Sequence, residues 1–148
     1  MHSRTVSFSV AAPRDIVFNF LADIENLPSW AAEFCERLEL HQGRWWAYTT
    51  RGEMFVDLES NDSTGVIDLR VGPAPDRLEL RPIRVLPLAA HRTLVNFTLL
   101  PLPGLSDELY ERRYQSLLLD MSGILRRFGG GELHVPEAAL QLAEMGLN

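Results

Sequence analysis

The sequence predicts an α+β fold, in which a curved antiparallel sheet of about six to seven strands wraps around one long helix near the C-terminus. Three observations predict it. A strand pattern opens the chain and precedes two short helical segments; about six segments that alternate polar and apolar residues follow; and an apolar stripe at helical spacing covers 106–128. Strands joined by short turns pair antiparallel, and only the long helix is large enough to cover one face of such a sheet.

The beginning of the chain predicts one strand and two short helices. Residues 5–10 alternate polar and apolar side chains, as a half-buried strand does. Pro13 suits the first turn of a helix, and the apolar residues that follow it repeat at helical spacing over 13–23. A corner containing Pro28 then leads into a second, shorter helix over 28–33.

The middle of the chain predicts the meander. Alternation and turn residues place its strands at 34–41, 44–51, 53–60, 64–71, 77–90 and 91–100. Proline cannot donate a hydrogen bond to a neighbouring strand. Pro82 and Pro87 therefore predict that the strand over 77–90 is bent or lies at an edge of the sheet.

The long helix and the segment after it divide the chain in two. Ser106 is a favourable N-cap, two acidic residues follow it in the first turn, and three glycines end the helix after residue 128. We therefore expect a domain over 1–128, and a glycine hinge with a short amphipathic helix over 129–148. A helix this short is unstable alone. We expect it to dock on its own sheet or on a second copy of the chain, as a homodimer contact.

Composition excludes several classes of function. The chain has 148 residues and a formal net charge of −6, and all 14 basic residues are arginine. The lack of lysine excludes Schiff-base catalysis on lysine and a phosphate-binding P-loop. The acidic balance argues against a nucleic-acid partner, because binding to a phosphate backbone requires a basic surface.

Other sequence patterns indicate the cellular compartment and which cofactors to expect. Cys35 is the single cysteine, so no disulfide or thiolate cluster is expected. The four histidines show no metal-ligand spacing, and no glycine-rich dinucleotide motif follows a strand, so neither a metal nor another cofactor is predicted. No apolar run approaches the roughly 18 residues of a membrane span, and residues 1–7 do not resemble a signal peptide. We therefore expect a cytoplasmic protein.

Two motifs resemble a known superfamily. The first runs from Val10-Ala11-Ala12-Pro13 to Asn26-Leu27-Pro28-Ser29-Trp30, and the second is Pro103-Gly104-Leu105-Ser106-Asp107-Glu108. Over residues 3–128 the chain resembles the START-like helix-grip proteins, most of all the polyketide cyclase/dehydrase-like (SRPBCC) branch. The resemblance implies a helix-grip fold with a space between sheet and helix. It does not imply one function, because the superfamily includes lipid carriers, aromatase/cyclases and quinone-binding proteins.

Alternation predicts which residues line that space. If the apolar faces of the strands point inward, Leu78 and Leu80 lie inside, and the outer face holds Asp57, Glu59, Asp68, Arg70, Arg77 and Glu79. Asp120 is expected on the flank of the long helix and Cys35 in a strand. Trp45 and Trp46 must point to opposite faces, and the sequence leaves open which one points inward. The predicted ligand-binding residues are Trp30, Trp46, Tyr48, Met54, Val56, Leu69, His91, Phe97, Tyr110, Tyr114 and Met121.

Three functions fit these features. In the first, an apolar cavity binds a hydrophobic small molecule that is lipid-like, polyketide or aromatic. In the second, the protein is a cyclase or dehydratase of the lyase or isomerase type, in which His91 assists proton transfer together with a tyrosine such as Tyr114. The alternative for His91 is a half-exposed position at the start of its strand, in contact with water. In the third, the core is filled and the chain is a protein interaction module.

Overall fold

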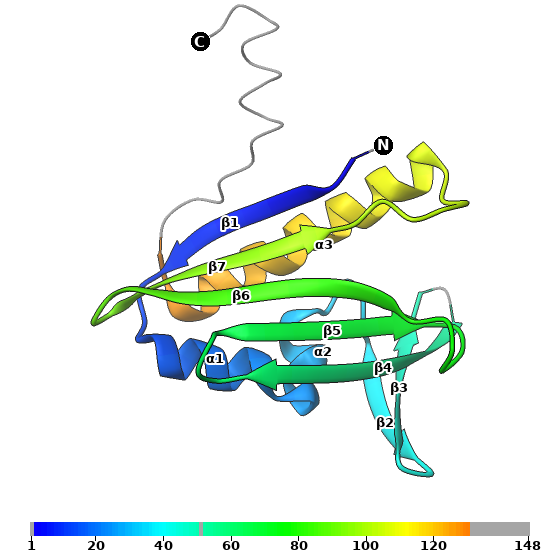
Figure 1. The fold of residues 1–148 in the computed structure, drawn as a ribbon, viewed down its shortest axis with the longest axis horizontal. Coiled ribbons are helices and arrows are strands. Elements are labelled where there is room, and N and C mark those ends of the chain that lie inside the picture. The colour runs from blue at the N-terminus through cyan, green and yellow to red at the C-terminus, as the bar shows by residue number, and fades with distance from the viewer. Residues whose placement is uncertain (1, 51, 131–148) are drawn as a thin grey trace, which may run out of the picture.

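The computed structural model describes residues 2–50 and 52–130 (Figure 1). The elements are, in chain order, β1 (Arg4–Val10), α1 (Arg14–Ala22), the 3₁₀ helix η1 (Ile24–Asn26), α2 (Leu27–Trp30), β2 (Arg37–His41), β3 (Arg44–Thr49), β4 (Gly52–Asn61), β5 (Val66–Gly72), β6 (Glu79–Ala89), β7 (Arg92–Leu99) and α3 (Asp107–Phe128). This order confirms the predicted fold class. The short helix that the sequence predicts after the glycine hinge, within residues 129–148, lies outside the described residues, and so does the predicted dimer contact.

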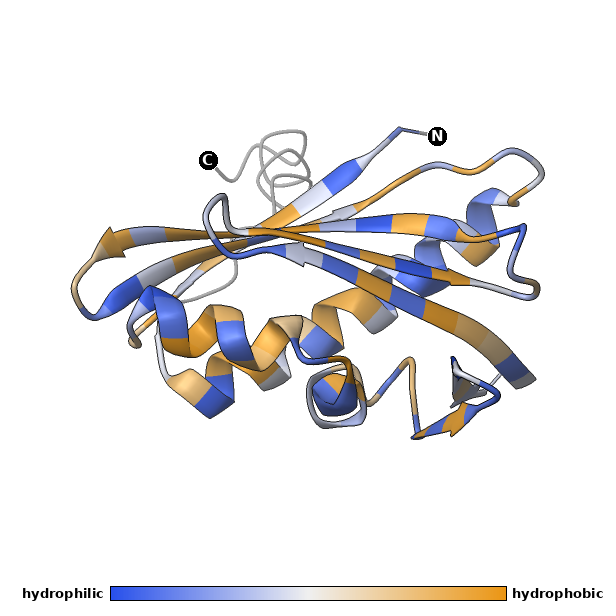
Figure 2. Ribbon diagram, turned by 60° about the horizontal axis from the view of Figure 1, so that its bottom comes forward, coloured by the Kyte–Doolittle hydropathy of each residue, from blue (hydrophilic) through white to orange (hydrophobic). Residues whose placement is uncertain are grey.

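The seven strands form one antiparallel sheet in the order β1-β7-β6-β5-β4-β3-β2. The meander from β2 to β7 is therefore continuous, and β1 joins it beside β7. Figure 2 shows α1, α2 and α3 on one face of this sheet. Alternate residues of β1 and β7 are buried under the helices, and on α3 Met121 and Ile124 are fully buried against them.

Both ends of α3 are fixed by local interactions. The Ser106 hydroxyl accepts a hydrogen bond from the Leu109 amide at 3.2 Å, and two acidic residues occupy the first turn. At the other end, Gly129 adopts a positive φ of 76°, and its carbonyl accepts a hydrogen bond from the Ala11 amide at 2.8 Å. The C-terminal end of α3 is thereby tied to the end of β1.

The two prolines of β6 lie where the strand has one neighbour. β5 pairs with residues 79–84 of β6, whereas β7 pairs with residues 83–89. Pro82 therefore faces only β5, and Pro87 faces only β7 next to a shift in register. The strand is internal in the sheet order, not an edge strand. Each proline still has one side without a paired strand, so no backbone hydrogen-bond donor is needed on that side.

The prediction of which residues in the first half of β6 point inward is wrong. Val71 lies opposite Glu79, and Leu69 lies opposite Arg81, so both charged residues share the inner face of the sheet. Leu80 lies opposite Arg70 on the outer face. The apolar pattern changes phase at Pro82: beyond it, Ile83 and Val85 are fully buried.

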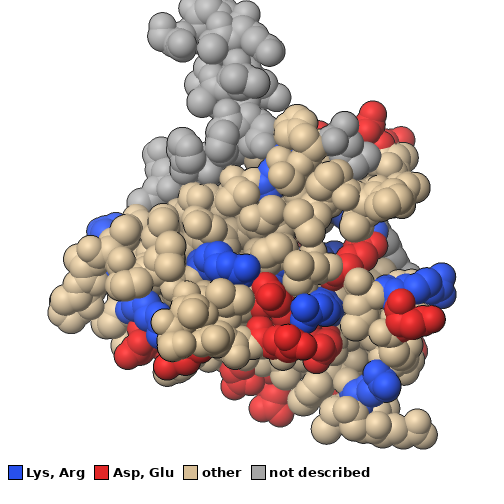
Figure 3. Space-filling view, viewed as in Figure 1, with Lys and Arg blue, Asp and Glu red and all other residues tan. Residues whose placement is uncertain are grey.

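The outer face of the sheet carries cross-strand ion pairs. Arg84 lies 3.1 Å from Asp68, and Arg70 lies 3.5 Å from Glu59. Figure 3 shows acidic and basic side chains mixed over this side of the molecule. Exposed pairs of this kind contribute under about 1 kcal/mol each.

Among the described helices, none is both long and apolar enough to cross a membrane.

Candidate functional site

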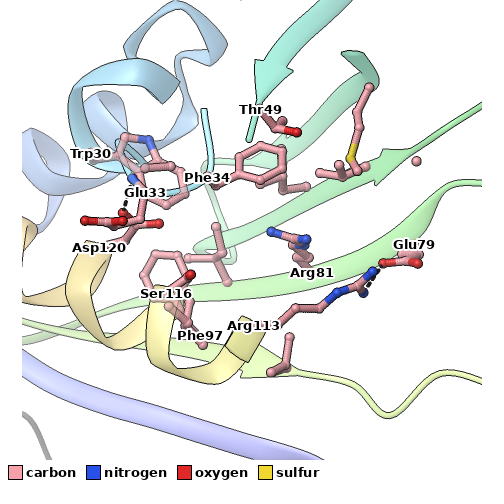
Figure 4. Close-up of a pocket in the computed structure, with 18 of the residues that line it drawn as sticks. Trp30, Glu33, Phe34, Thr49, Glu79, Arg81, Phe97, Arg113, Ser116 and Asp120 are labelled. Carbon is pink, nitrogen blue, oxygen red and sulfur yellow. Dashed lines mark hydrogen bonds and ion pairs between the residues drawn. The ribbon is translucent and has the colours of Figure 1, made fainter. Parts of the chain in front are cut away.

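A cavity of about 310 Å³ lies between the sheet and α3, beside the segment that follows α2 (Figure 4). β4, β5, β6 and β7 form its floor, and α3 forms one wall. Its lining residues are Trp30, Ala31, Glu33, Phe34, Thr49, Thr50, Met54, Leu69, Val71, Gly72, Pro73, Glu79, Arg81, Ile83, Phe97, Thr98, Leu99, Arg113, Ser116, Leu117 and Asp120.

Aromatic side chains make up much of the wall. Trp30, the last residue of α2, is only 5% exposed, and its ring lies 5.5 Å from that of Phe97 on β7. The Trp30 Nε1 donor is buried and has no hydrogen-bond partner among the described residues. A buried indole N–H usually has an acceptor, so this donor is an exception in the packing around Trp30.

The segment after α2 is a set of turns, not the beginning of a strand. The amides of Phe34 and Cys35 both donate to the Ala31 carbonyl, at 3.0 and 2.7 Å. The prediction that Cys35 lies in a strand is therefore wrong. Burial raises the pKa of its thiol to about 11, so the thiolate is disfavoured at neutral pH. These turns place Glu33 and Phe34 at the cavity.

Asp120 joins this segment to α3. Its Oδ1 atom accepts a hydrogen bond from the Glu33 amide at 2.9 Å, and the residue is only 7% exposed. Burial raises the pKa of Asp120 to about 7; the amide and the charge of Arg81 oppose this shift, while the charge of Glu33 adds to it. The expected position on the flank of the helix is wrong, because the carboxyl lines the cavity.

Two arginines bring positive charge to the cavity. Arg113 of α3 pairs with Glu79 through its Nη1 atom at 2.8 Å, and its Nε atom is buried without a partner among the described residues. The Arg81 guanidinium lies 4.8 Å from the centre of the Phe34 ring. Figure 4 shows Arg81 projecting from β6 and Arg113 from α3. Arginine keeps its charge when buried.

The structure brings four of the predicted ligand-binding residues together. Trp30, Met54, Leu69 and Phe97 all line the cavity. Val56 and Met121 are buried in the core but are not among the lining residues.

The predicted aromatic residues of β3 lie elsewhere. Trp45 pairs with Val56, and Ala47 pairs with Met54, so these two residues of β3 share the inner face. Trp46 and Tyr48 point to the other face: the Trp46 ring packs on Phe55 at 3.8 Å, and the Tyr48 hydroxyl donates to Glu39 at 3.1 Å. Neither lines the cavity.

The residues predicted for proton transfer are also outside the cavity. His91 is exposed in the turn between β6 and β7, as the alternative reading of this residue expected. Tyr110 and Tyr114 are buried, and the Arg4 guanidinium packs against both rings. The Tyr110 hydroxyl donates to the His2 carbonyl at 2.6 Å. Within residues 2–50 and 52–130, no group of three or more acidic, histidine or cysteine side chains is arranged to hold a metal ion.

Comparison with known proteins gives the fold. No protein-family model matches the chain, and no curated protein matches it. Among solved structures, it is similar to a START superfamily protein from Mycobacterium smegmatis, with a TM-score of 0.54 and 13% identity over 86% of this chain and 99% of that one. It is also similar to an aromatase/cyclase from a Streptomyces species, with a TM-score of 0.58 and 21% identity over 84% and 90%.

A third similar structure has a different role. It is an HSP90 activator from Plasmodium falciparum, with a TM-score of 0.65 and 12% identity over 88% of this chain and 99% of that one. The chain therefore shares the helix-grip fold of these proteins, as its motifs predict. Because one fold hosts several functions, the function must be argued from the cavity.

Proposed function

We propose that the chain binds a hydrophobic small molecule in the cavity between the sheet and α3. The observation that carries this proposal is the 310 Å³ space itself. Protein interiors are normally close-packed, and ligand pockets begin at about this size, roughly 300 Å³. The interaction-module hypothesis expects a filled core, so the cavity also argues against that hypothesis. The START superfamily likeness supports the same function.

The walls favour a ligand that contains rings or a lipid-like chain. Trp30, Phe34 and Phe97 offer aromatic faces and edges to a flat apolar group. Met54 has a flexible, polarisable side chain that adapts to ligands of different shape. The ligand would therefore lie between α3 and the central strands.

Trp30 is a natural reporter for this proposal. In a variant that carries Trp45→Phe and Trp46→Phe, only Trp30 emits, because the chain has three tryptophans. Bromonaphthalene is a neutral apolar probe whose bromine quenches tryptophan in contact. We expect saturable quenching of Trp30, because this side chain lines the cavity.

The matched control is Trp30→Phe, which keeps the two tryptophans of β3. We expect bromonaphthalene to quench this variant only weakly and without saturation. Equal quenching of the two variants, or no quenching of Trp30, would contradict binding in the cavity.

A second function is favoured by Asp120. A cyclase or dehydratase needs a group that takes up and releases a proton beside an enolisable substrate. A carboxyl whose pKa is about 7 is suited to that task. We therefore propose Asp120, in place of His91, as the acid or base if the protein has this activity.

Proton exchange at a model ketone tests the enzymatic function. We expect the wild-type protein to accelerate exchange of the α-protons of acetophenone in deuterated water, followed by NMR. The Asp120→Asn variant should be slower by about 100-fold or more, the usual contribution of a general base. An Asp57→Asn variant, changed on the exposed outer face, should retain the wild-type rate. No acceleration by the wild-type protein would remove this candidate.

A further inference from the structure

The charged side chains that line the cavity do not balance. Among the described residues, the lining contains three carboxylates and two guanidiniums, which belong to Glu33, Glu79, Asp120, Arg81 and Arg113. Arg113 pairs with Glu79 at 2.8 Å, so these two charges compensate each other. What is left of this lining sets the carboxylates of Glu33 and Asp120 against one guanidinium, that of Arg81. When both acids are ionised, this part of the wall therefore has an excess of negative charge.

Asp120 has one carboxylate oxygen that the fold does not use. Its Oδ1 atom accepts the hydrogen bond from the Glu33 amide at 2.9 Å. Its Oδ2 atom accepts none from the described residues, and it is not among the fully buried polar atoms that lack a partner, so it keeps accessible surface. The residue as a whole is only 7% exposed and lines the cavity. The second oxygen therefore offers a ligand an acceptor at a point that little bulk water reaches.

The charges around Asp120 favour a cation as the partner of this oxygen. Burial has the largest effect on the carboxyl and raises its pKa; the negative charge of Glu33 raises it further, by more than the positive charge of Arg81 lowers it. The Cys35 thiol also acts on this carboxyl, and its own pKa of about 11 keeps it neutral. Figure 4 shows Glu33 and Asp120 close together at the cavity wall. A positive group bound beside them would offset the repulsion between the two carboxylates.

We propose that the hydrophobic ligand carries a protonated amine, which donates a hydrogen bond to Asp120 Oδ2 while the apolar part of the ligand lies against Trp30 and Phe97. The proposal rests on the proposed function and specifies its ligand class. A hydrogen bond from an ammonium to a carboxylate is charge-assisted, and it is stronger where the local dielectric constant is low. Aromatic faces also attract cations, and the Arg81 guanidinium already lies 4.8 Å from the centre of the Phe34 ring.

Three probes with one skeleton separate charge from shape. Naphthylmethylamine is a cation at neutral pH, naphthalenemethanol is a neutral molecule of almost the same size, and naphthoate is an anion. Each can be titrated into the wild-type protein by calorimetry at pH 8. We expect the amine to bind at least about tenfold more tightly than the alcohol, as a charge-assisted hydrogen bond requires. The naphthoate should bind more weakly than the alcohol.

The variant Asp120→Asn should abolish the preference for the amine, because asparagine keeps the shape of the side chain but cannot carry its charge. We expect this variant to lose at least about tenfold in affinity for naphthylmethylamine and less than about twofold for naphthalenemethanol. The matched control is Glu108→Gln, because Glu108 lies on the same helix but pairs with Arg112 in an exposed position. The control should keep the affinities of both probes.

The affinity for the amine should also depend on pH, because Asp120 must be ionised to accept the ammonium. The pKa of Asp120 is about 7, so at pH 6 the carboxyl is mostly protonated and its proton must leave when the amine binds. Naphthylmethylamine itself stays mostly protonated up to pH 8. We expect the wild-type protein to bind it about tenfold more tightly at pH 8 than at pH 6. The binding of naphthalenemethanol, and the binding of the amine to Asp120→Asn, should show no such change.

The outcomes distinguish the two levels of the proposal. If the wild-type protein binds the alcohol or the naphthoate as tightly as the amine, or if Asp120→Asn weakens the amine and the alcohol equally, the amine is wrong and the hydrophobic cavity stands. If none of the three probes binds, the proposed function fails and this inference fails with it. Should Asp120→Asn not fold, the pH dependence of amine binding to the wild-type protein decides.

Discussion

A phenylalanine at position 116 is expected to remove ligand binding and leave the fold intact. Ser116 lies on α3 and lines the cavity, so a ring placed there would occupy the space that the ligand needs. We expect Ser116→Phe to lose at least about tenfold in affinity for N-phenylnaphthylamine, a shortfall of about 1.4 kcal/mol. The fluorescence of N-phenylnaphthylamine rises in an apolar site, so titration of this probe measures the loss of affinity.

The neighbouring residue provides the control for this substitution. Gln115 is on the same helix and is exposed, so Gln115→Phe adds the same ring outside the cavity. We expect it to bind the probe as the wild-type protein does. Ser116→Phe should melt within a few degrees of the wild type, since its ring enters a space instead of a packed core. Wild-type affinity in Ser116→Phe would contradict the position of the site.

The Asp120→Asn variant is expected to be more stable than the wild type, and increasingly so as pH rises. The pKa of Asp120 is raised from 3.8 to about 7 in the folded protein. Between these values the native state holds a proton that the unfolded chain has released, so the stability of the wild type falls as pH rises through this window. The difference between these two pKa values corresponds to roughly 4 kcal/mol of stability.

Asparagine is neutral at every pH and still offers an oxygen to the Glu33 amide. The stability gain of Asp120→Asn should therefore grow by about 2–3 kcal/mol between pH 5 and pH 8, measured by urea unfolding at both values. Asp57→Asn is the control, because Asp57 is exposed on the outer face. If wild type and Asp120→Asn show parallel stability profiles, the carboxyl of Asp120 is ionised in the native state throughout this range.

The fold could be predicted from the sequence because the sheet has one covered face. Helices lie on that face and solvent on the other, so the strands alternate apolar and polar residues. The pattern failed at β6, where Glu79 and Arg81 occupy inner positions because they line a cavity instead of a packed core. The fully buried residues Ile83 and Val85 share their parity, and this signal could have identified the inner face.

The face of the sheet to which each residue of β3 points could be determined only from the structure. Its residues 45 and 46 are both tryptophan, so alternation alone fits either face. The pairing of Trp45 with Val56 settles the question, because Val56 is buried under the helices.

The polar part of the site was harder to predict. Arg113, Leu117 and Asp120 follow one another at helical spacing, so they share one side of α3. This spacing could have placed Asp120 beside the apolar stripe. The contact between Asp120 and the Glu33 amide joins residues that are 87 positions apart, and it depends on how the turns after α2 pack on α3. No local pattern in the sequence encodes that packing.

The most direct test of the central claim is native mass spectrometry of freshly purified protein, followed by organic extraction of the bound molecule. We expect a mass above that of the chain, and an extracted compound that is hydrophobic. The same measurement after incubation with a small-molecule extract of the host cell covers the case of a ligand lost during purification. Only the mass of the bare chain in both samples would contradict a ligand-binding cavity.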